Sequence, residues 1–379
     1  MSWKLTNLGT LIDVLSGFAF DSKKFSDSSG KPLIRIRDIK RSYTETYYNG
    51  NFEEKYVVKF GDVLIGMDGE FNVAEWNGTD ALLNQRVCKV TVKDPNHLDL
   101  RYLLYFLPYE LKLIEDKASF VTVKHLSVND VKNIQIPLPP LATQKRIAEI
   151  LDAADALRRK DQELLKKYDE LAQAIFIDMF GDPVKNEKGW ETKQFKELGT
   201  LDRGVSKHRP RNAPELLGGI YPLIQTGDVA NSGGIITKHK ATYSDLGLKQ
   251  SKLWEKGTLC ITIAANIAKT GILDFDACFP DSIVGFKPNE KISNSKFIQY
   301  WIGFLQKILE DNAPESAQKN INLEILRGLD VICPPIELQN DFENKLYKVN
   351  SLKNKSSDKI DDDLFESLIQ KAFNGELVS

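Results

Sequence analysis

The sequence predicts an α+β protein in which two repeated α/β domains are separated by a pair of long antiparallel coiled-coil helices, related by a pseudo-two-fold axis. Three observations predict this fold class: a proline-rich motif occurs twice, short β-like runs precede each occurrence, and a long helical pattern follows each. The chain has 379 residues, of which 42% are hydrophobic. Because a domain takes roughly 100–200 residues, this length suits two domains with connecting structure.

The repeated motif is the strongest sign of a tandem duplication. Pro139–Gln144 recurs as Pro334–Gln339, a shift from 139 to 334, or 195 positions. Upstream, Pro32–Ile39 matches Pro222–Val229 with a shift from 32 to 222, or 190 positions. The matches keep the same order along the whole chain, so we infer that the two halves descend from one unit.

Each half begins with a globular domain. Short β-like runs, such as Lys31–Ile39, Tyr56–Ile65 and Arg86–Val92, are broken by Gly, Asn and Asp. Leu100–Ile114 and its counterpart Ser295–Leu309 have apolar residues at helical spacing. We therefore expect both strands and a helix in each globular domain.

A long helix is expected after each Pro-Pro pair. Apolar residues of the first helix recur every seven positions, with Asp161 as a polar exception. The positions expected to pair in it are Ile147, Ile150, Leu157, Leu164, Tyr168, Leu171 and Ile175. Those expected in the second helix, which the polar stretch Lys353–Lys359 interrupts, are Phe342, Leu346, Val349, Ile360, Leu364 and Leu368. A helix of about 35 residues is roughly 50 Å long, and the other helix is the simplest cover for its apolar stripe.

Four segments follow from this organisation. We expect a first globular domain at 1–137, a first helical spacer at 138–185, a second globular domain at 186–332 and a second helical spacer at 333–379. Antiparallel pairing of the spacers would bring Ser379 back towards Met1.

Composition argues against a metal, a cofactor or a membrane. The four cysteines, Cys88, Cys260, Cys278 and Cys333, form no C-x-x-C pair, so we expect reduced thiols and neither a metal site nor a cofactor. The N-terminus has no apolar signal core, which predicts a cytoplasmic protein without membrane contact. The net charge of −2 requires any nucleic-acid surface to come from local clusters of Lys and Arg.

The organisation resembles the specificity subunit of Type I restriction-modification systems. The motifs that carry the resemblance are Pro137–Leu151, which reads PLPPLATQKRIAEIL, and Phe180–Pro183 followed by Gly189–Trp190. The resemblance implies that each globular domain is a target-recognition domain that reads one half of a bipartite site in double-stranded DNA. It implies that the helices set the spacer between the half-sites and bind two methyltransferase subunits. Motor-nuclease subunits would join for restriction, so that adenine methylation and cleavage belong to partners and this chain has no active site.

Candidate DNA-binding residues in the first half are basic and aromatic. We expect Arg35 and Arg37 to lie on one face of a strand, where guanidinium groups could bind guanine. A solvated strand face is the alternative. The candidates in this half are Arg35, Arg37, Lys40, Arg41, Tyr43, Gln85, Arg86 and Lys124.

The second half has different polar residues at the aligned positions, with Gln225 for Arg35 and Gly227 for Arg37. Two different half-sites would require such a difference, whereas a duplicated catalytic site would be expected to keep its groups. A flexible basic loop from Arg203 to Arg211 is suited to phosphate contact, or it is a solvent loop. The candidates in this half are Lys207, His208, Arg209, Arg211, Gln225, Thr226, Asn266, Lys269 and Lys319.

Two other functions compete with DNA recognition. A nuclease is disfavoured because Asp99 and Glu110-x-Lys112, which fit a loose D…E-x-K pattern, have Gln306 and Lys307 in the second half where a carboxylate would be needed. The sequence also lacks a phosphate-binding loop and a methyltransferase motif. A coiled-coil adaptor that does not bind DNA is the second alternative, and salt-dependent binding to random duplex would distinguish it.

Overall fold

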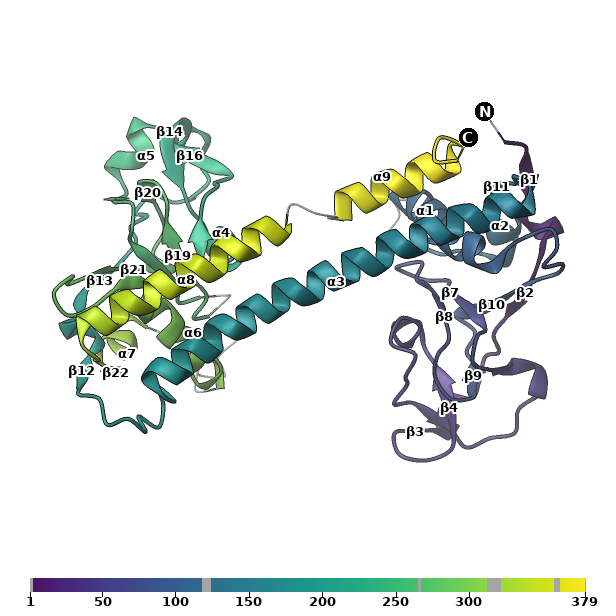
Figure 1. The fold of residues 1–379 in the computed structure, drawn as a ribbon, viewed down its shortest axis with the longest axis horizontal. Coiled ribbons are helices and arrows are strands. Elements are labelled where there is room, and N and C mark those ends of the chain that lie inside the picture. Colours follow the sequence, from purple (N-terminus) through teal and green to yellow (C-terminus); the bar gives the residue numbers. More distant parts are fainter. Residues whose placement is uncertain (1–2, 118–123, 265–266, 312–321, 358–361, 379) are drawn as a thin grey trace. The chain divides into compact units, whose positions relative to one another are not determined.

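The computed structural model describes residues 3–117, 124–264, 267–311, 322–357 and 362–378. It divides into two units (Figure 1). Unit 1 comprises Met1–Glu163 and Ser357–Ser379, and unit 2 comprises Leu164–Ser356. The boundary falls inside α3 (Leu141–Phe180), an uninterrupted helix of 40 residues, so this helix contributes to both units.

Unit 1 contains sheets in the strand orders β2-β10-β7-β8, β3-β5-β4-β9-β6 and β1-β11. Its strands are β1 (Leu5–Asn7), β2 (Ile12–Ser16), β3 (Phe25–Ser26), β4 (Lys31–Ile34), β5 (Tyr47–Tyr48), β6 (Val57–Val58), β7 (Val63–Gly66), β8 (Val73–Glu75), β9 (Ala81–Leu83), β10 (Val87–Val92) and β11 (Gln135–Pro137). Besides α3, its helices are η1 (Leu8–Thr10), η2 (Ser22–Lys24), η3 (Ile36–Asp38), η4 (Glu54–Tyr56), α1 (Leu100–Lys117), α2 (Val128–Asn133) and α9 (Asp362–Phe373).

Unit 2 contains sheets in the orders β13-β21-β18-β19-β15, β16-β14-β20-β17 and β12-β22. Its strands are β12 (Thr192–Gln194), β13 (Gly199–Arg203), β14 (Leu217–Leu223), β15 (Ile235–Ile236), β16 (Ala241–Tyr243), β17 (Leu253–Trp254), β18 (Leu259–Thr262), β19 (Thr270–Leu273), β20 (Ala277–Cys278), β21 (Ile283–Pro288) and β22 (Asp330–Ile332). Besides α3, its helices are η5 (Phe195–Glu197), η6 (Pro214–Leu216), α4 (Thr226–Ala230), α5 (Asp245–Lys249), α6 (Ser295–Asp311), α7 (Leu323–Arg327) and α8 (Ile336–Ser357).

The two units share a common topology, to which unit 1 adds the edge strand β3 and unit 2 the edge strand β15. In each, the first strand pairs with the strand before the long helix, as β1 with β11 and β12 with β22. Each also contains one equivalent parallel pair, β4 with β9 and β14 with β20. The mixed α/β class with two sheet-rich domains and a long helix, predicted from the duplicated motif, is confirmed.

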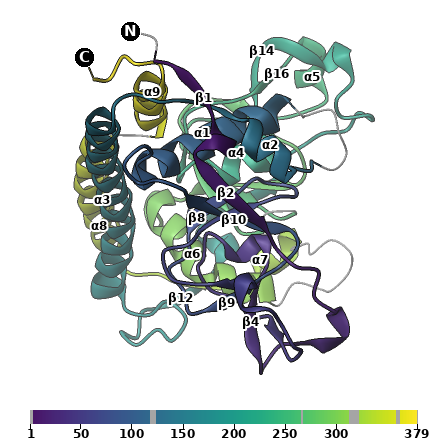
Figure 2. The same cartoon turned by 90° about the vertical axis from the view of Figure 1, so that its right-hand side faces the viewer.

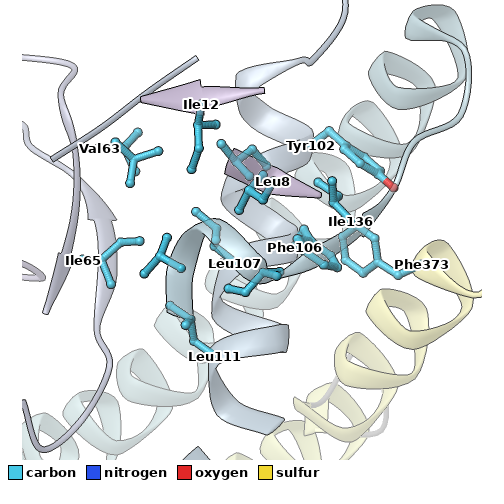
Figure 3. Packing of buried hydrophobic residues seen from close by; sticks show 14 of the residues in the cluster. Leu8, Ile12, Val63, Ile65, Tyr102, Phe106, Leu107, Leu111, Ile136 and Phe373 are labelled. Atoms are coloured by element: carbon cyan, nitrogen blue, oxygen red, sulfur yellow. The ribbon is translucent and has the colours of Figure 1, made fainter. Parts of the chain in front are cut away.

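Each unit has its own apolar core. In unit 1, Leu8, Ile12, Val63 and Ile65 face Phe106 and neighbouring residues of α1, and Phe373 of α9 completes the cluster (Figure 3). The ring of Phe373 lies 5.3 Å from that of Tyr102 and 5.1 Å from that of Phe106. Trp3, near the start of the chain, and Leu377, near its end, pack against this same core.

The long helices pair antiparallel within each unit, as predicted. In unit 1, Arg158 of α3 forms an ion pair with Asp362 at 2.7 Å, and its guanidinium lies 4.7 Å from the centre of the Phe365 ring. In unit 2, Phe342 packs on Phe176, while Lys353 further along α8 reaches back to Asp169. Figures 1 and 2 both show α8 running beside α3.

The predicted pairing stripe requires correction. Leu157, Leu171 and Leu364 are 42%, 44% and 45% exposed. A strict seven-residue repeat drifts by about 20° per heptad on a straight helix, so it leaves the buried face of α3. In α9, Phe365 is buried in place of the neighbouring Leu364.

The other predicted pairing positions vary in burial. Ile147, Phe342, Leu346 and Val349 are buried, whereas Ile150, Leu164, Tyr168, Ile175 and Leu368 are half-buried. Ile360 lies outside the described residues.

A buried glutamine joins each long helix to its globular domain. Gln144 accepts a hydrogen bond from the Asp99 backbone N–H at 2.9 Å and donates to the carbonyls of His97 and Pro139. Gln339 makes the equivalent bonds to Asn294 and to the carbonyls of Ile292 and Pro334. The duplicated Pro-Pro-x-x-x-Gln motif is therefore a structural joint, in which a buried amide satisfies buried backbone groups.

Candidate nucleic-acid interface

The first group of exposed basic residues follows β4. The Arg35 backbone N–H donates to the Asp38 carboxylate at 2.8 Å and caps η3. The Arg35 side chain is exposed, and its guanidinium lies 5.8 Å from the centre of the Phe25 ring. The predicted strand with Arg35 and Arg37 on one face is wrong, because β4 ends at Ile34 and a capped turn begins there. Both arginines still point to solvent, and Arg37 is 61% exposed.

The same cap occurs in unit 2 with different side chains. The Gln225 backbone N–H donates to the Asp228 carboxylate at 2.9 Å, and α4 begins at Thr226. Gln225 is exposed and Thr226 half-buried. The two units therefore share this backbone turn, while position 35 presents a guanidinium and position 225 presents an amide. Lys40, Arg41 and Tyr43, which follow η3, are also exposed.

A glycine positions the turn that carries Gln85 and Arg86, both exposed. A Cβ on Gly17 would lie 2.0 Å from the carbonyl oxygen of Asn84 in that turn. In unit 2, a Cβ on Gly204 would lie 2.3 Å from the carbonyl oxygen of Phe279. Only glycine allows two backbone segments to approach so closely. The same close approach therefore fixes the equivalent turn in each unit.

In unit 1, Asp68 binds two basic side chains, Arg86 and His125, and the three residues form the Asp68 cluster. Its carboxylate binds the Arg86 guanidinium at 2.9 Å through Oδ2 and Nδ1 of His125 at 2.6 Å through Oδ1. Asp68 comes from the β7–β8 turn, Arg86 from the β9–β10 turn and His125 from the segment before α2. Three distant parts of the sequence thus meet at one carboxylate.

Lys40 and Lys124 lie beside the same β7–β8 turn. Lys40 lines a pocket of about 260 Å³ together with Phe71 and Glu115. Lys124 forms an ion pair with Glu115 at 3.2 Å, and its carbonyl accepts from the Gly69 N–H. Two predicted residues from separate segments are therefore close to the Asp68 cluster.

The predicted basic loop of unit 2 is tied to the fold. Arg211 pairs with the Asp281 carboxylate, and Arg209 lies 3.9 Å from it. The Arg209 guanidinium also donates to the Ser206 carbonyl at 2.6 Å, and the His208 backbone N–H donates to Gln250 at 3.0 Å. The expected flexible loop is therefore an anchored one. Lys207, His208, Arg209 and Arg211 are all exposed.

Lys269 lies at a second pocket, of about 720 Å³, within unit 2. Its ammonium donates to Gln306 at 3.3 Å. Lys296 also lines this pocket, and burial lowers the pKa of Lys296. Asn266 and Lys319, also predicted to bind DNA, lie outside the described residues.

The nuclease pattern has a structural explanation. The Asp99 carboxylate accepts from the backbone N–H groups of Arg101 and Tyr102, both at 3.0 Å, and so caps α1. Lys112 pairs with Asp116 one turn further along the same helix, at 3.0 Å. Asp99 thus caps the start of α1, and Lys112 forms an ion pair on the surface of the same helix.

Potential metal ligands do not gather in the part of the chain that the structure describes, where no three His, Cys, Asp or Glu side chains could share an ion. Cys88, Cys260 and Cys278 are buried thiols, and burial raises the pKa of Cys88 to about 12. None of the described helices is both long enough and apolar enough to cross a membrane.

The sequence matches the family model described as "Type I restriction modification DNA specificity domain" over residues 1–167 and 187–362. The chain belongs to this family. The two matched stretches correspond to the two repeats, and the alternative of an adaptor that does not bind DNA has no support from this match.

Relatives of this specificity-domain family cover the whole chain. The chain is 31% identical over 417 aligned positions to the Type I restriction enzyme EcoBI specificity subunit of Escherichia coli, covering 100% of this chain and 87% of that protein. Its fold is similar to the Type I restriction-modification S subunit from M. genitalium, with a TM-score of 0.56 and 15% identity over 98% of this chain and 96% of that one. A chain from a structural study of complex assembly in the type I R-M system gives a TM-score of 0.58 and 18% identity, covering 99% and 98% of the two chains.

Two carboxylates were not among the residues that sequence reasoning selected. Asp68 and Asp281 each hold basic side chains that the sequence did select, namely Arg86 in unit 1 and Arg209 and Arg211 in unit 2. Both are acidic, so a search for Lys and Arg clusters passes over them.

Proposed function

We propose that this chain is the DNA-recognition subunit of a Type I restriction-modification complex and reads a bipartite sequence through its two globular domains. The domains are 1–137 and 186–332, and the spacer helices are 138–185 and 333–379. One observation carries the proposal: the same capped turn presents Arg35 in one unit and Gln225 in the other. Keeping the scaffold while changing the exposed side chain is what reading two different half-sites requires.

The partners in this proposal are double-stranded DNA, two methyltransferase subunits and motor-nuclease subunits, acting together in the cytoplasm. Methylation and cleavage belong to those partners, and this chain supplies sequence specificity. The exposed apolar residues of α3, Leu157 and Leu171, support a role of the helices in binding the methyltransferase subunits, since exposed apolar side chains favour an interface.

The residues proposed to contact DNA in the first unit lie around η3 and beside the β7–β8 turn: Arg35, Arg37, Lys40, Arg41, Tyr43, Gln85, Arg86 and Lys124. In the second unit they are Lys207, His208, Arg209, Arg211, Gln225, Thr226, Asn266, Lys269 and Lys319. Lys and Arg are suited to phosphate contacts, and Arg and Gln can also bind base edges in the major groove.

Two measurements on the complex with its methyltransferase subunits test the proposal. Long-read sequencing of host DNA is expected to show methylation at one bipartite motif, which disappears when the gene for this chain is deleted. Binding of the complex to random duplex is expected to weaken as salt rises, because phosphate contacts release counterions. An unchanged methylation map after deletion, or binding without any salt dependence, would contradict the proposal.

A further inference from the structure

The turn between β7 and β8 is fixed on both sides by backbone hydrogen bonds. Met67 N–H donates to the Arg86 carbonyl at 2.9 Å, which ties the turn to the β9–β10 turn. On the other side, Gly69 N–H donates to the Lys124 carbonyl at 3.0 Å, and Leu126 N–H donates to the Met67 carbonyl at 2.8 Å. Asp68 lies between these bonds, so its backbone is held in place before any ligand arrives.

The Asp68 carboxylate is mostly covered, while the groups that it holds are open to solvent. Its side chain is 16% exposed, whereas those of Arg86 and His125 are 64% and 67% exposed. Each carboxylate oxygen binds one of the two partners. The arrangement restricts two side chains that would otherwise sample several rotamers, and such preorganisation lowers the entropic cost of binding.

We propose that Asp68 is a positioning residue that presents Arg86 and His125 to a G·C base pair of the first half-site. The inference rests on the proposed function, since it assigns part of the reading surface within it. Asp68 itself would not touch DNA and would act through the two side chains that it holds.

The hydrogen-bonding groups at the cluster match a G·C pair. An ionised carboxylate only accepts hydrogen bonds, so the Nδ1 of His125 must donate to Asp68. In the neutral ring, Nε2 is then an acceptor, and the His125 side chain is mostly exposed. Arg86 binds Asp68 through NH1 and keeps further guanidinium N–H groups for another partner. Guanine presents the acceptors O6 and N7 in the major groove, and cytosine presents the N4 donor.

The equivalent place in unit 2 has a different cluster. Ile263 N–H donates to the Ser282 carbonyl at 3.0 Å, as Met67 N–H does to the Arg86 carbonyl, so Ser282 occupies the position of Arg86. There the carboxylate is Asp281, and it holds Arg209 and Arg211 from another loop. A carboxylate that orients arginines thus occurs in both units but is built from different positions, which favours different target bases.

The experiment uses the full chain assembled with its methyltransferase subunits and duplexes that carry the methylated motif. Each guanine of the first half-site is replaced in turn by 7-deazaguanine, which keeps base pairing but lacks the N7 acceptor. We expect the wild-type complex to bind about tenfold more weakly when one particular guanine is replaced, since the contact then loses one of its two acceptors.

Asp68→Asn, Arg86→Ala and Arg86→Lys are expected to lose this discrimination and to bind both duplexes alike. Asp152→Asn is the matched control, because Asp152 also holds two donors in unit 1, the Arg101 guanidinium and the Tyr105 hydroxyl. It is expected to discriminate as the wild type does. Thermal unfolding and assembly with the methyltransferase subunits check that each variant folds. Since the Arg86 side chain is mostly exposed, Arg86→Ala tests the reading role even if Asp68→Asn does not fold.

The inference is overturned if no guanine of the first half-site responds to 7-deazaguanine, or if folded Asp68→Asn keeps the wild-type discrimination. Failure of the proposed function would differ, because the wild-type complex would then not select a bipartite sequence at all.

Discussion

At the scale of single residues, the glutamine of the duplicated motif contributes to the fold and not to recognition. Gln144 and Gln339 are 0% and 1% exposed and satisfy backbone groups at the start of α1 and α6. The duplication that the motif reveals in the sequence therefore reflects a joint that both units need.

We expect Gln144→Ala to lower the free energy of unfolding by at least about 1–3 kcal/mol, because it leaves buried backbone groups without partners. Chemical denaturation, monitored by circular dichroism, measures the change in the free energy of unfolding. Gln162→Ala is the control, since Gln162 lies on the surface and makes a 3.5 Å contact with Asp362. Surface substitutions usually change stability by less than about 0.5 kcal/mol. If Gln144→Ala lost no more free energy of unfolding than Gln162→Ala, the joint would not be needed for stability.

Arg35→Ala is expected to weaken DNA binding without loss of stability, because the side chain is exposed and the cap uses the backbone N–H. A base contact would give a loss of about 1–3 kcal/mol at particular base pairs, whereas a phosphate contact would give a nearly uniform loss. Binding titrations on cognate and altered duplexes separate the two. Arg146→Ala, on the surface of α3, serves as the control. Unchanged binding on every sequence would remove Arg35 from the interface.

At the scale of helices and strands, α9 completes the core of unit 1. Phe365, Ile369, Ala372 and Phe373 are buried there with residues of α1 and α3. A helix from the end of the chain thus covers apolar surface of the first domain.

Phe365→Ala is expected to destabilise the protein by about 3–5 kcal/mol, since it removes a buried aromatic side chain. Leu157→Ala should cost less than about 1 kcal/mol in the isolated chain, because Leu157 is 42% exposed. Urea unfolding of both variants measures the difference. In pull-down assays with the methyltransferase subunits, Leu157→Ala is expected to assemble more weakly. If Leu157→Ala instead lowered the free energy of unfolding as much as Phe365→Ala, Leu157 would belong to the pairing face of α3, as the sequence predicted.

The long helices and the repeat could be predicted because their signals are local and occur twice. The face of α9 could not be predicted, since the polar stretch Lys353–Lys359 separates it from the stripe of α8 and Leu364 and Phe365 are both apolar. The strand predicted through Arg35 was wrong because Ile34 and Ile36 alternate with polar neighbours as in a strand, whereas the Asp38 cap ends the strand. The Asp68 cluster joins residues 57 positions apart, from Asp68 to His125, and no local pattern reports such a contact.

At the scale of the whole molecule, α3 belongs to both units without interruption. Ala154 is in the core of unit 1, and Ala172 is in the core of unit 2. The stretch between them therefore offers a place to change the length of the connection with little effect on either core.

Deleting Glu163–Lys166 is expected to change the spacer tolerated between the half-sites while leaving both half-sites the same. Four residues correspond to about 6 Å of helix, and DNA rises about 3.4 Å per base pair, so we expect a change of about two base pairs. Methylation mapping in cells measures the spacer. Replacing the same four residues by alanines keeps the helix length and should leave the spacer unchanged. A new half-site after the deletion would contradict a role of α3 in spacing.

The capped turns at Asp38 and Asp228 also bear on how such a protein acquires new targets. At both turns the aspartate holds the backbone of the residue three positions earlier, and the side chain of that earlier residue is left to solvent. A codon change can therefore replace the guanidinium at position 35 by an amide, or the amide at position 225 by a guanidinium, at little cost to folding. Evolution can thus try new sequence preferences one substitution at a time, with each intermediate still a folded protein.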